Sequence, residues 1–205
     1  MTDNLQTLRE DIGFLRELAE VGRSPNLAGG SMLVAAGAIF GLASLVHGAV
    51  AIGWARGVSP WVFPAIWVAA MAIYICTLAA LKGGYTDASG EQSSRAMKLA
   101  WQAMGWTIFA VFVCSQIIAW RTQSTLPLAM LPSVILSLYG LAWMVVAGVS
   151  HKAWIRRTAI GAFVAALAAA FLCQSPWVFL LFAAAMVWLA VIPGLIMMRQ
   201  ASRSA

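Results

Sequence analysis

The stretch AGGSMLVAAGAIFGLASLVHGAVAIG, residues 28–53, decides the fold of this chain. It contains no Asp, Glu, Lys or Arg, and it is longer than the roughly 20 helical residues that cross the apolar core of a bilayer. Backbone N–H and C=O groups in lipid must bond to one another, so a run of this kind forms a helix. The stretch therefore predicts a transmembrane helix.

Five further apolar runs have the same character, and the composition of the whole chain agrees with them. Of its 205 residues, 62% are hydrophobic and 10% are charged. A soluble domain carries about 25% charged residues. We expect an all-α, polytopic membrane protein with six transmembrane helices. They lie at about 28–53, 60–82, 99–120, 127–149, 153–174 and 176–198, after a cytoplasmic helix and linker at 1–27 and before a short cytoplasmic tail at 199–205.

The connections between these runs alternate in character. Three of them, at 55–60, 121–127 and 174–176, are short turns that contain proline, which is well tolerated in the first turn of a helix. The other two, at 82–98 and 150–157, are more polar. This alternation predicts three consecutive helical hairpins.

Two of the expected helices begin with the same five residues. The sequence SPWVF occurs at 59–63 and again at 175–179. Repeated hairpins occur in several transporter folds, where binding sites form at the interface between repeats. Apolar membrane sequence also matches itself through its restricted composition, so both interpretations stay open.

The basic residues indicate how the chain is oriented. On the expected topology, eleven of them lie on one side of the membrane and two on the other. Basic loops stay in the cytoplasm, so both termini are expected there, in a bacterial inner membrane. The eleven are Arg9, Arg16, Arg23, Lys82, Arg95, Lys98, Lys152, Arg156, Arg157, Arg199 and Arg203, and the two are Arg56 and Arg121.

A charged segment, LREDIGFLRELAEVGR at 8–23, precedes the first apolar run. Its apolar residues follow a three-four spacing, which predicts an amphipathic helix over about 4–21. Residues 1–23 hold five acids and three arginines, whereas helices that lie on lipid are rich in Lys and Arg. We therefore expect this helix to bind protein, either a partner or a second copy. The expected contact residues are Leu5, Leu8, Ile12, Leu15 and Ala19.

His47 is the only ionisable residue well inside an apolar run, if Tyr and Cys are set aside. Such a residue is a functional-site hypothesis by default. Gln116, Gln174 and Ser115 are expected at comparable depth, so the four residues can line a ligand-binding polar cup that opens to the outside. The alternative is that His47 and the glutamines bond across helices and only stabilise the bundle.

Small residues recur on one face of the first expected helix. They include a GxxxG pair, and such residues let helix backbones approach closely in lipid. The stripe predicts a packed seam, which is formed either within the chain or with a second copy. Its members are Gly30, Gly37, Gly41, Ser44 and Gly48.

No catalytic residues, metal ligands or cofactor site are expected. All seven acids lie outside the apolar runs, and His47 and His151 are separated by most of the membrane thickness. No paired carboxylates, phosphate-binding Gly loop or nucleophile elbow is present. The basic residues sit beside apolar runs and not in a nucleic-acid-binding motif, so nucleic acid is not an expected partner.

The run DIGFLRELAEVGRSPNLAGGSMLVAAGAIFGLASLVHGA, residues 11–49, resembles the start of small six-helix inner-membrane proteins of proteobacteria, a group without an assigned function. The resemblance covers about the first quarter of the chain. It implies a bacterial inner membrane and transfers no site residue.

Three functions remain open at this point. The first is a non-enzymatic accessory or regulatory subunit that acts through the N-terminal helix and through helix–helix association. The second is a small transporter or channel for a neutral or weakly polar solute that uses the polar cup. The third is a haem- or pigment-linked subunit with His47 as a single axial ligand.

Overall fold

The structure is a computed structural model, and it describes residues 29–55, 57–82 and 92–202. The expected helix at 4–21 lies outside these residues. The described part is entirely helical, without a strand. Its elements are α2 (Gly30–Ala51), α3 (Val62–Lys82), α4 (Gln92–Thr122), α5 (Leu126–Ala129), α6 (Leu131–Ser150), α7 (Ala153–Phe171), α8 (Trp177–Met186), the π-helix η1 (Val187–Val191) and α9 (Ile192–Ala201).

These elements form six helical segments that are long and apolar enough to cross a membrane. This confirms the expectation of an all-α chain with six such helices, as in a multi-pass membrane protein. The fourth segment consists of α5 and α6, and the sixth consists of α8, η1 and α9. In both composite segments the last helix starts with a proline in its first turn. This residue is Pro132 in α6 and Pro193 in α9.

Three helix ends differ from the sequence-based limits by three residues or more, and one of them is the end of α9, at Ala201 and not near 198. Helix α4 begins at Gln92 and not near 99, since 92–98 is polar but contains no Gly or Pro that would end a helix. Helix α7 ends at Phe171 and not near 174. There the chain turns through Gln174, which has a left-handed φ of 67° and is followed by Ser175 and Pro176.

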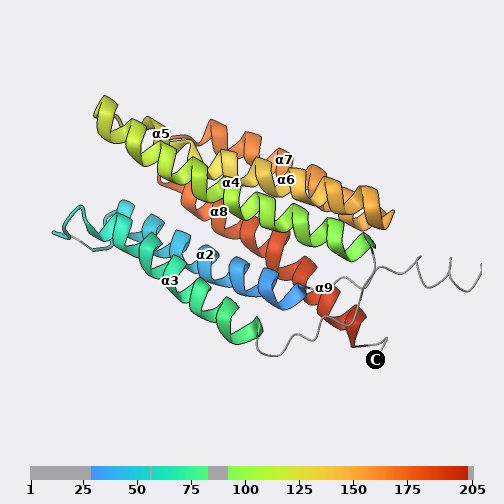
Figure 1. The fold of residues 1–205 in the computed structure, drawn as a ribbon. Coiled ribbons are helices and arrows are strands. Elements are labelled where there is room, and N and C mark those ends of the chain that lie inside the picture. Colours follow the sequence, from blue (N-terminus) through green and yellow to red (C-terminus); the bar gives the residue numbers. More distant parts are fainter. Residues whose placement is uncertain (1–28, 56, 83–91, 203–205) are drawn as a thin grey trace, which may run out of the picture.

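The first and last segments run side by side in opposite directions at the centre of the bundle (Figure 1). Gly30 at the start of α2 lies beside Gly194 in α9, and Gly48 near the end of α2 lies beside Phe179 in α8. We call the end of the bundle where α2 begins the Gly30 end. The opposite end, where α8 begins, is the Gln174 end.

The largest helix–helix interface joins α6 and α7, which are connected by only two residues, His151 and Lys152. Helix α6 contributes Leu136 and Trp143, both fully buried. Helix α7 contributes a stripe of small side chains that lets the two backbones approach closely. Its members are Ala159, Ala162, Ala166 and Ala169.

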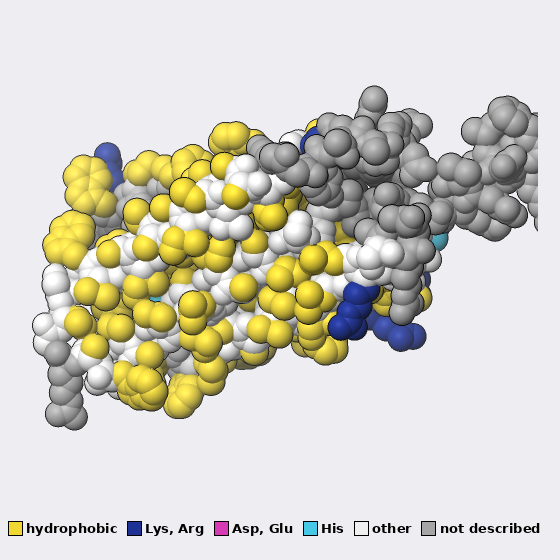
Figure 2. All heavy atoms as spheres, turned by 90° about the horizontal axis from the view of Figure 1, so that it is seen from below, with side chains coloured by type: hydrophobic (Ala, Val, Ile, Leu, Met, Phe, Trp, Pro, Cys, Tyr) yellow, Lys and Arg dark blue, Asp and Glu magenta, His cyan; other side chains and the backbone are white. Residues whose placement is uncertain are grey.

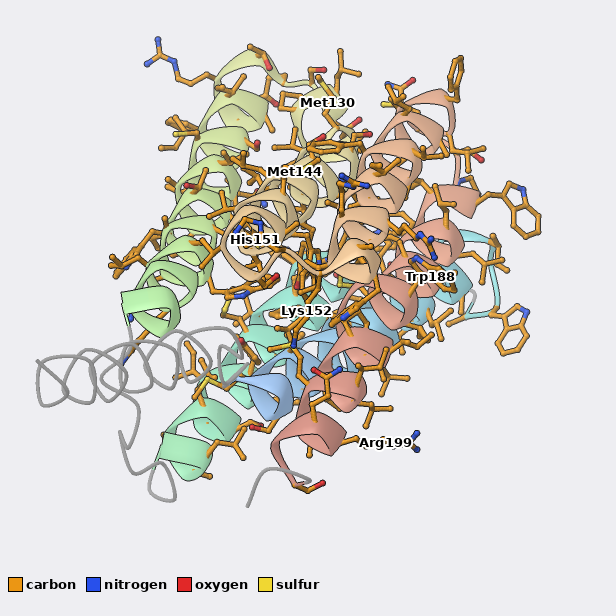
Figure 3. The ribbon with its side chains drawn as sticks, turned by 90° about the vertical axis from the view of Figure 1, so that its right-hand side faces the viewer. Met130, Met144, His151, Lys152, Trp188 and Arg199 are labelled. Atoms are coloured by element: carbon orange, nitrogen blue, oxygen red, sulfur yellow. The ribbon has the colours of Figure 1, made fainter. Side chains whose placement is uncertain are left out.

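The six segments are buried to very different extents. In α3 and α4, 6% of the apolar window is buried inside the chain, compared with 33–44% in the other four segments. Helix α3 packs chiefly on α2, and α4 packs on α5 and α6. Figures 1 and 3 show α3 and α4 on the same side of the bundle. These two helices are therefore outer elements.

The two segments of each expected hairpin are in contact, α2 with α3, α4 with α6 and α7 with α8. The most extensive interface joins two segments that the hairpin interpretation assigns to different hairpins, so the grouping into three hairpins stays a prediction. Apolar side chains cover most of the face in Figure 2, and Lys and Arg side chains appear at its two ends. Four exposed indoles lie at the Gln174 end, those of Trp54, Trp61, Trp120 and Trp177.

Candidate functional site

The two copies of SPWVF build the same local structure at the starts of α3 and α8. In each copy the serine Oγ accepts a hydrogen bond from the backbone N–H of the tryptophan two residues later, at 3.4 Å for Ser59 and 3.4 Å for Ser175. Each serine C=O also accepts a backbone bond from the valine, at 3.0 and 3.1 Å. The repeated sequence thus starts two helices with one conformation.

The phenylalanines of both copies contact the same residue, His47. Its ring is stacked on Phe179 with centroids 3.8 Å apart, and it meets Phe63 at 4.7 Å. The two rings belong to helices α8 and α3, on either side of α2 in the packing order. Each phenylalanine is the last residue of its SPWVF copy. The repeat therefore supplies one aromatic contact to His47 from α3 and one from α8.

Trp67, one turn after Phe63 in α3, forms a hydrogen bond with a ring nitrogen of His47. Its indole Nε1–H donates a hydrogen bond to His47 Nδ1 at 3.0 Å. An acceptor nitrogen carries no proton, so this geometry corresponds to the neutral imidazole with its proton on Nε2. Within the residues that the structure describes, Nε2 has no hydrogen-bond partner. The Trp67 ring also meets Phe182 of α8 edge-on at 6.5 Å.

A pocket of about 250 Å³ opens at the Gln174 end, next to this aromatic cluster. It is formed by the end of α2, the junction of α5 and α6, and the start of α8. Phe179 borders the pocket and also stacks on His47, so one ring separates the two. The pocket is lined by Ala51, Leu128, Ala129, Pro132, Gln174, Ser175, Pro176, Val178 and Phe179.

The four residues of the expected polar cup fall into two groups. Gln174 lines the pocket and His47 lies behind Phe179. Gln116 and Ser115 lie on α4, which packs on α5 and α6 and makes no extensive contact with α2. Ser115 is buried and Gln116 is exposed, and neither borders the pocket. Similar depth along the bundle therefore does not bring the four side chains together.

The small-residue stripe of α2 faces the sixth segment of the same chain. A Cβ added at Gly30 would lie 2.6 Å from the backbone O of Gly194, and one at Gly37 would lie 2.7 Å from Val191 Cγ2. Gly41 and Gly48 lie against α8, at added-Cβ distances of 3.5 Å to Met186 and 3.1 Å to Phe179.

Ser44, the hydroxyl member of the stripe, carries the only side-chain hydrogen bond that the structure gives to this seam in its described residues. Its Oγ donates to the backbone O of Phe179 at 2.8 Å, and the residue is fully buried. Helix α2 therefore contacts Phe179 of α8 in two ways. Ser44 bonds to its backbone O, and His47 stacks on its ring.

Sequence reasoning missed several residues of this site. Trp67 lies well inside an apolar run, where an indole N–H needs an acceptor, and His47 was the available candidate. Phe63 and Phe179 carried a signal in the SPWVF repeat. The alanine stripe of α7 follows the same small-residue logic as the glycine stripe of α2. The expected contact residues Leu5, Leu8, Ile12, Leu15 and Ala19 lie outside the described part of the chain.

Comparison of the chain with protein-family models, with curated proteins and with solved structures finds no match.

Proposed function

We propose that this protein is a non-enzymatic subunit of the bacterial inner membrane that acts by associating with another membrane protein. The single observation that supports this most is that the side chain of His47 is held by contacts within the chain. It is the only ionisable side chain well inside the apolar runs, Tyr and Cys aside, and it is held by Trp67, Phe63 and Phe179. A side chain bonded in this way stabilises the bundle, which suits a scaffold.

The outer position of α3 and α4 fits this role. Only 6% of each window is fully buried inside the chain, so the exposed face of both helices is available to lipid or to the helices of a partner. Interfaces between helices in membranes are formed by close van der Waals packing and interhelical hydrogen bonds. In the proposed arrangement three hairpins lie side by side with both termini in the cytoplasm, and the helix at 4–21 binds a cytoplasmic surface of the partner.

Purification from native membranes in a mild detergent tests this proposal. A partner or a second copy should accompany the full chain and should be lost when residues 1–22 are deleted. Leu8→Asp, on the expected apolar face, should reproduce the loss. Gln6→Asp adds the same charge on the opposite face and serves as the matched control. Identical complexes from all four proteins would refute the docking role of this segment.

A second candidate function is the passage or binding of a small neutral solute at the Gln174 end. The pocket of about 250 Å³, with the amide of Gln174 in its lining and Phe179 between it and His47, favours this candidate. Uptake of neutral solutes into liposomes tests it. Gln174→Ala should then lower the flux, with Gln116→Ala as the control because Gln116 lies outside the pocket. The absence of flux from the unmodified protein would exclude this function for the solutes tested.

A haem- or pigment-linked role is tested by the visible absorption spectrum of the protein purified from native membranes. A band that His47→Phe removes would support His47 as an axial ligand. A spectrum without visible absorption would dismiss the role.

A further inference from the structure

Basic side chains gather at the Gly30 end of the bundle, around the start of α7 and the end of α9. Arg156 and Arg157 are exposed near the start of α7, and Arg199 is exposed in the last turn of α9. Lys152, which precedes α7, donates a hydrogen bond to Gln200 Oε1 of α9 at 3.3 Å, so the two helix ends lie together. We call Lys152, Arg156, Arg157 and Arg199 the basic patch.

An exposed apolar stripe runs along the sixth segment from the basic patch towards the middle of the bundle. Residues three or four positions apart lie on one face of a helix. Trp188, Ile192 and Leu195 precede Arg199 at this spacing, and their side chains are 61%, 40% and 42% exposed. In Figure 3, Trp188 and Arg199 lie on the same side of the sixth segment. One charged group at the end of the bundle therefore continues into a surface that faces lipid.

Helix α7 extends this surface on the other side of the patch. Ile160 and Val164, three and seven residues after Arg157, are exposed. Gly161, one turn after Arg157, faces the sixth segment, because a Cβ added there would lie 3.4 Å from Trp188 Nε1. Helix α7 and the π-helix η1 are in contact at this level. The exposed apolar faces of α7 and of the sixth segment thus adjoin at Gly161 and Trp188.

The charge of the patch and the apolar surface beside it match one class of molecule. The described residues contain no Asp or Glu, since all seven acids of the chain lie in 1–28 and 83–91. Basic groups at the membrane surface attract anionic phospholipids, and clusters of them between spanning helices bind the headgroups. The acyl chains of such a lipid suit the exposed apolar stripe, which begins directly beside the arginines.

We propose that the basic patch and the apolar stripe form a binding site for a phospholipid of net negative charge. Arg157 and Arg199 bind the phosphate group, since a guanidinium donates two parallel hydrogen bonds to phosphate oxygens. Lys152 and Arg156 add positive charge beside them. The acyl chains lie along the stripe of the sixth segment and against the Trp188 ring. This ligand is independent of the proposed association with another membrane protein.

Native mass spectrometry of the full chain in a mild detergent tests the proposal, because it counts the lipids that remain bound. The probes are palmitoyl-oleoyl phosphatidylglycerol, which is anionic, and palmitoyl-oleoyl phosphatidylethanolamine, which has no net charge. Glycerophosphate is the third probe and supplies the phosphate group without acyl chains. The chain should bind phosphatidylglycerol more tightly than either of the other two.

Arg157→Gln and Arg199→Gln should each weaken phosphatidylglycerol binding by about fivefold, the effect of one charge at the membrane surface. Both variants should leave phosphatidylethanolamine binding within about twofold. Arg121→Gln removes an exposed arginine at the opposite, Gln174 end and is the matched control. It should leave phosphatidylglycerol binding within about twofold.

Four results would overturn the proposal. The first is equal affinity for the two lipids, and the second is a loss in Arg121→Gln as large as in the other two variants. The third is glycerophosphate that binds as tightly as phosphatidylglycerol, because the apolar stripe would then contribute nothing. The fourth is a preference for phosphatidylglycerol that arises only when residues 1–22 are deleted, since the patch would then bind the acidic segment of its own chain.

Discussion

Trp67 Nε1–H donates to His47 Nδ1 at 3.0 Å, and this bond joins the first and second spanning segments. His47, a candidate ligand-binding residue in the sequence, thus makes a cross-helix hydrogen bond of the kind that stabilises helix bundles in lipid. Its ring also contacts the two phenylalanines of the SPWVF copies.

Shape-conserving substitutions measure the value of this bond. His47→Phe keeps the ring contacts but removes the acceptor, so it should lower the free energy of unfolding by about 1–3 kcal/mol because the Trp67 N–H is left unpaired. Trp67→Phe removes the donor and should cost about 1 kcal/mol. In the double variant the second change should add little. Thermal or denaturant unfolding in detergent measures all three, with Trp106→Phe as a control at an exposed position. Strictly additive effects would show that the bond contributes nothing.

The glycine seam between α2 and the sixth segment predicts a position-specific effect of adding one methyl group. Gly30→Ala should destabilise the bundle by about 1–3 kcal/mol, because the new Cβ would lie 2.6 Å from the backbone O of Gly194, which cannot move alone. Gly105→Ala should leave stability unchanged or slightly raised, since a Cβ there meets nothing within 4 Å. The midpoint of thermal unfolding checks both. Equal midpoints for the two variants would contradict the packing of this seam.

Trp143 Nε1–H donates to the backbone O of Leu189 at 2.9 Å, and this bond has a cause in the sequence. Pro193, four residues after Leu189, has no N–H to donate to this carbonyl, and the helix between them includes the π-turn Val187–Val191. Trp143→Phe should therefore lower the free energy of unfolding by about 1–3 kcal/mol. Pro193→Ala supplies a new backbone donor. The cost of Trp143→Phe should be smaller in that background, and an unchanged cost would refute this explanation.

Part of this architecture was predictable from the sequence and part was not. Length and hydropathy of the apolar runs predict helices that can span a membrane, because lipid leaves the backbone no other solution. The same data do not say which helices touch. His47, Gln116 and Gln174 were expected at similar depths in the membrane. Gln116 belongs to α4, however, and the packing of the helices keeps α4 away from α2, which carries His47. Seams of small residues are visible in sequence, whereas their partner helix is not.

Replacing Gln174 by glycine should stabilise the protein, because the backbone of Gln174 is left-handed. Its φ of 67° is strained for any residue except glycine, so Gln174→Gly should raise the free energy of unfolding by about 1 kcal/mol. If the side chain serves the pocket, the same variant should lower solute binding, which separates strain from function. Gln123→Gly, at φ 52° and outside the pocket, also loses the bond from Gln123 Nε2 to the backbone O of Trp120 at 2.6 Å, so this control should raise stability by less and leave solute binding unchanged. A Gln174→Gly variant of unchanged stability would show that the turn is not strained.

The most direct test of the proposed associating role is the mass of the particle excised from native membranes in polymer nanodiscs and analysed by native mass spectrometry. One chain has a mass of 21.9 kDa. The proposed function predicts a defined protein mass above this value, which includes a partner or a second copy and decreases to that of a single chain when residues 1–22 are deleted. A particle that contains a single 21.9 kDa chain before any deletion would contradict it.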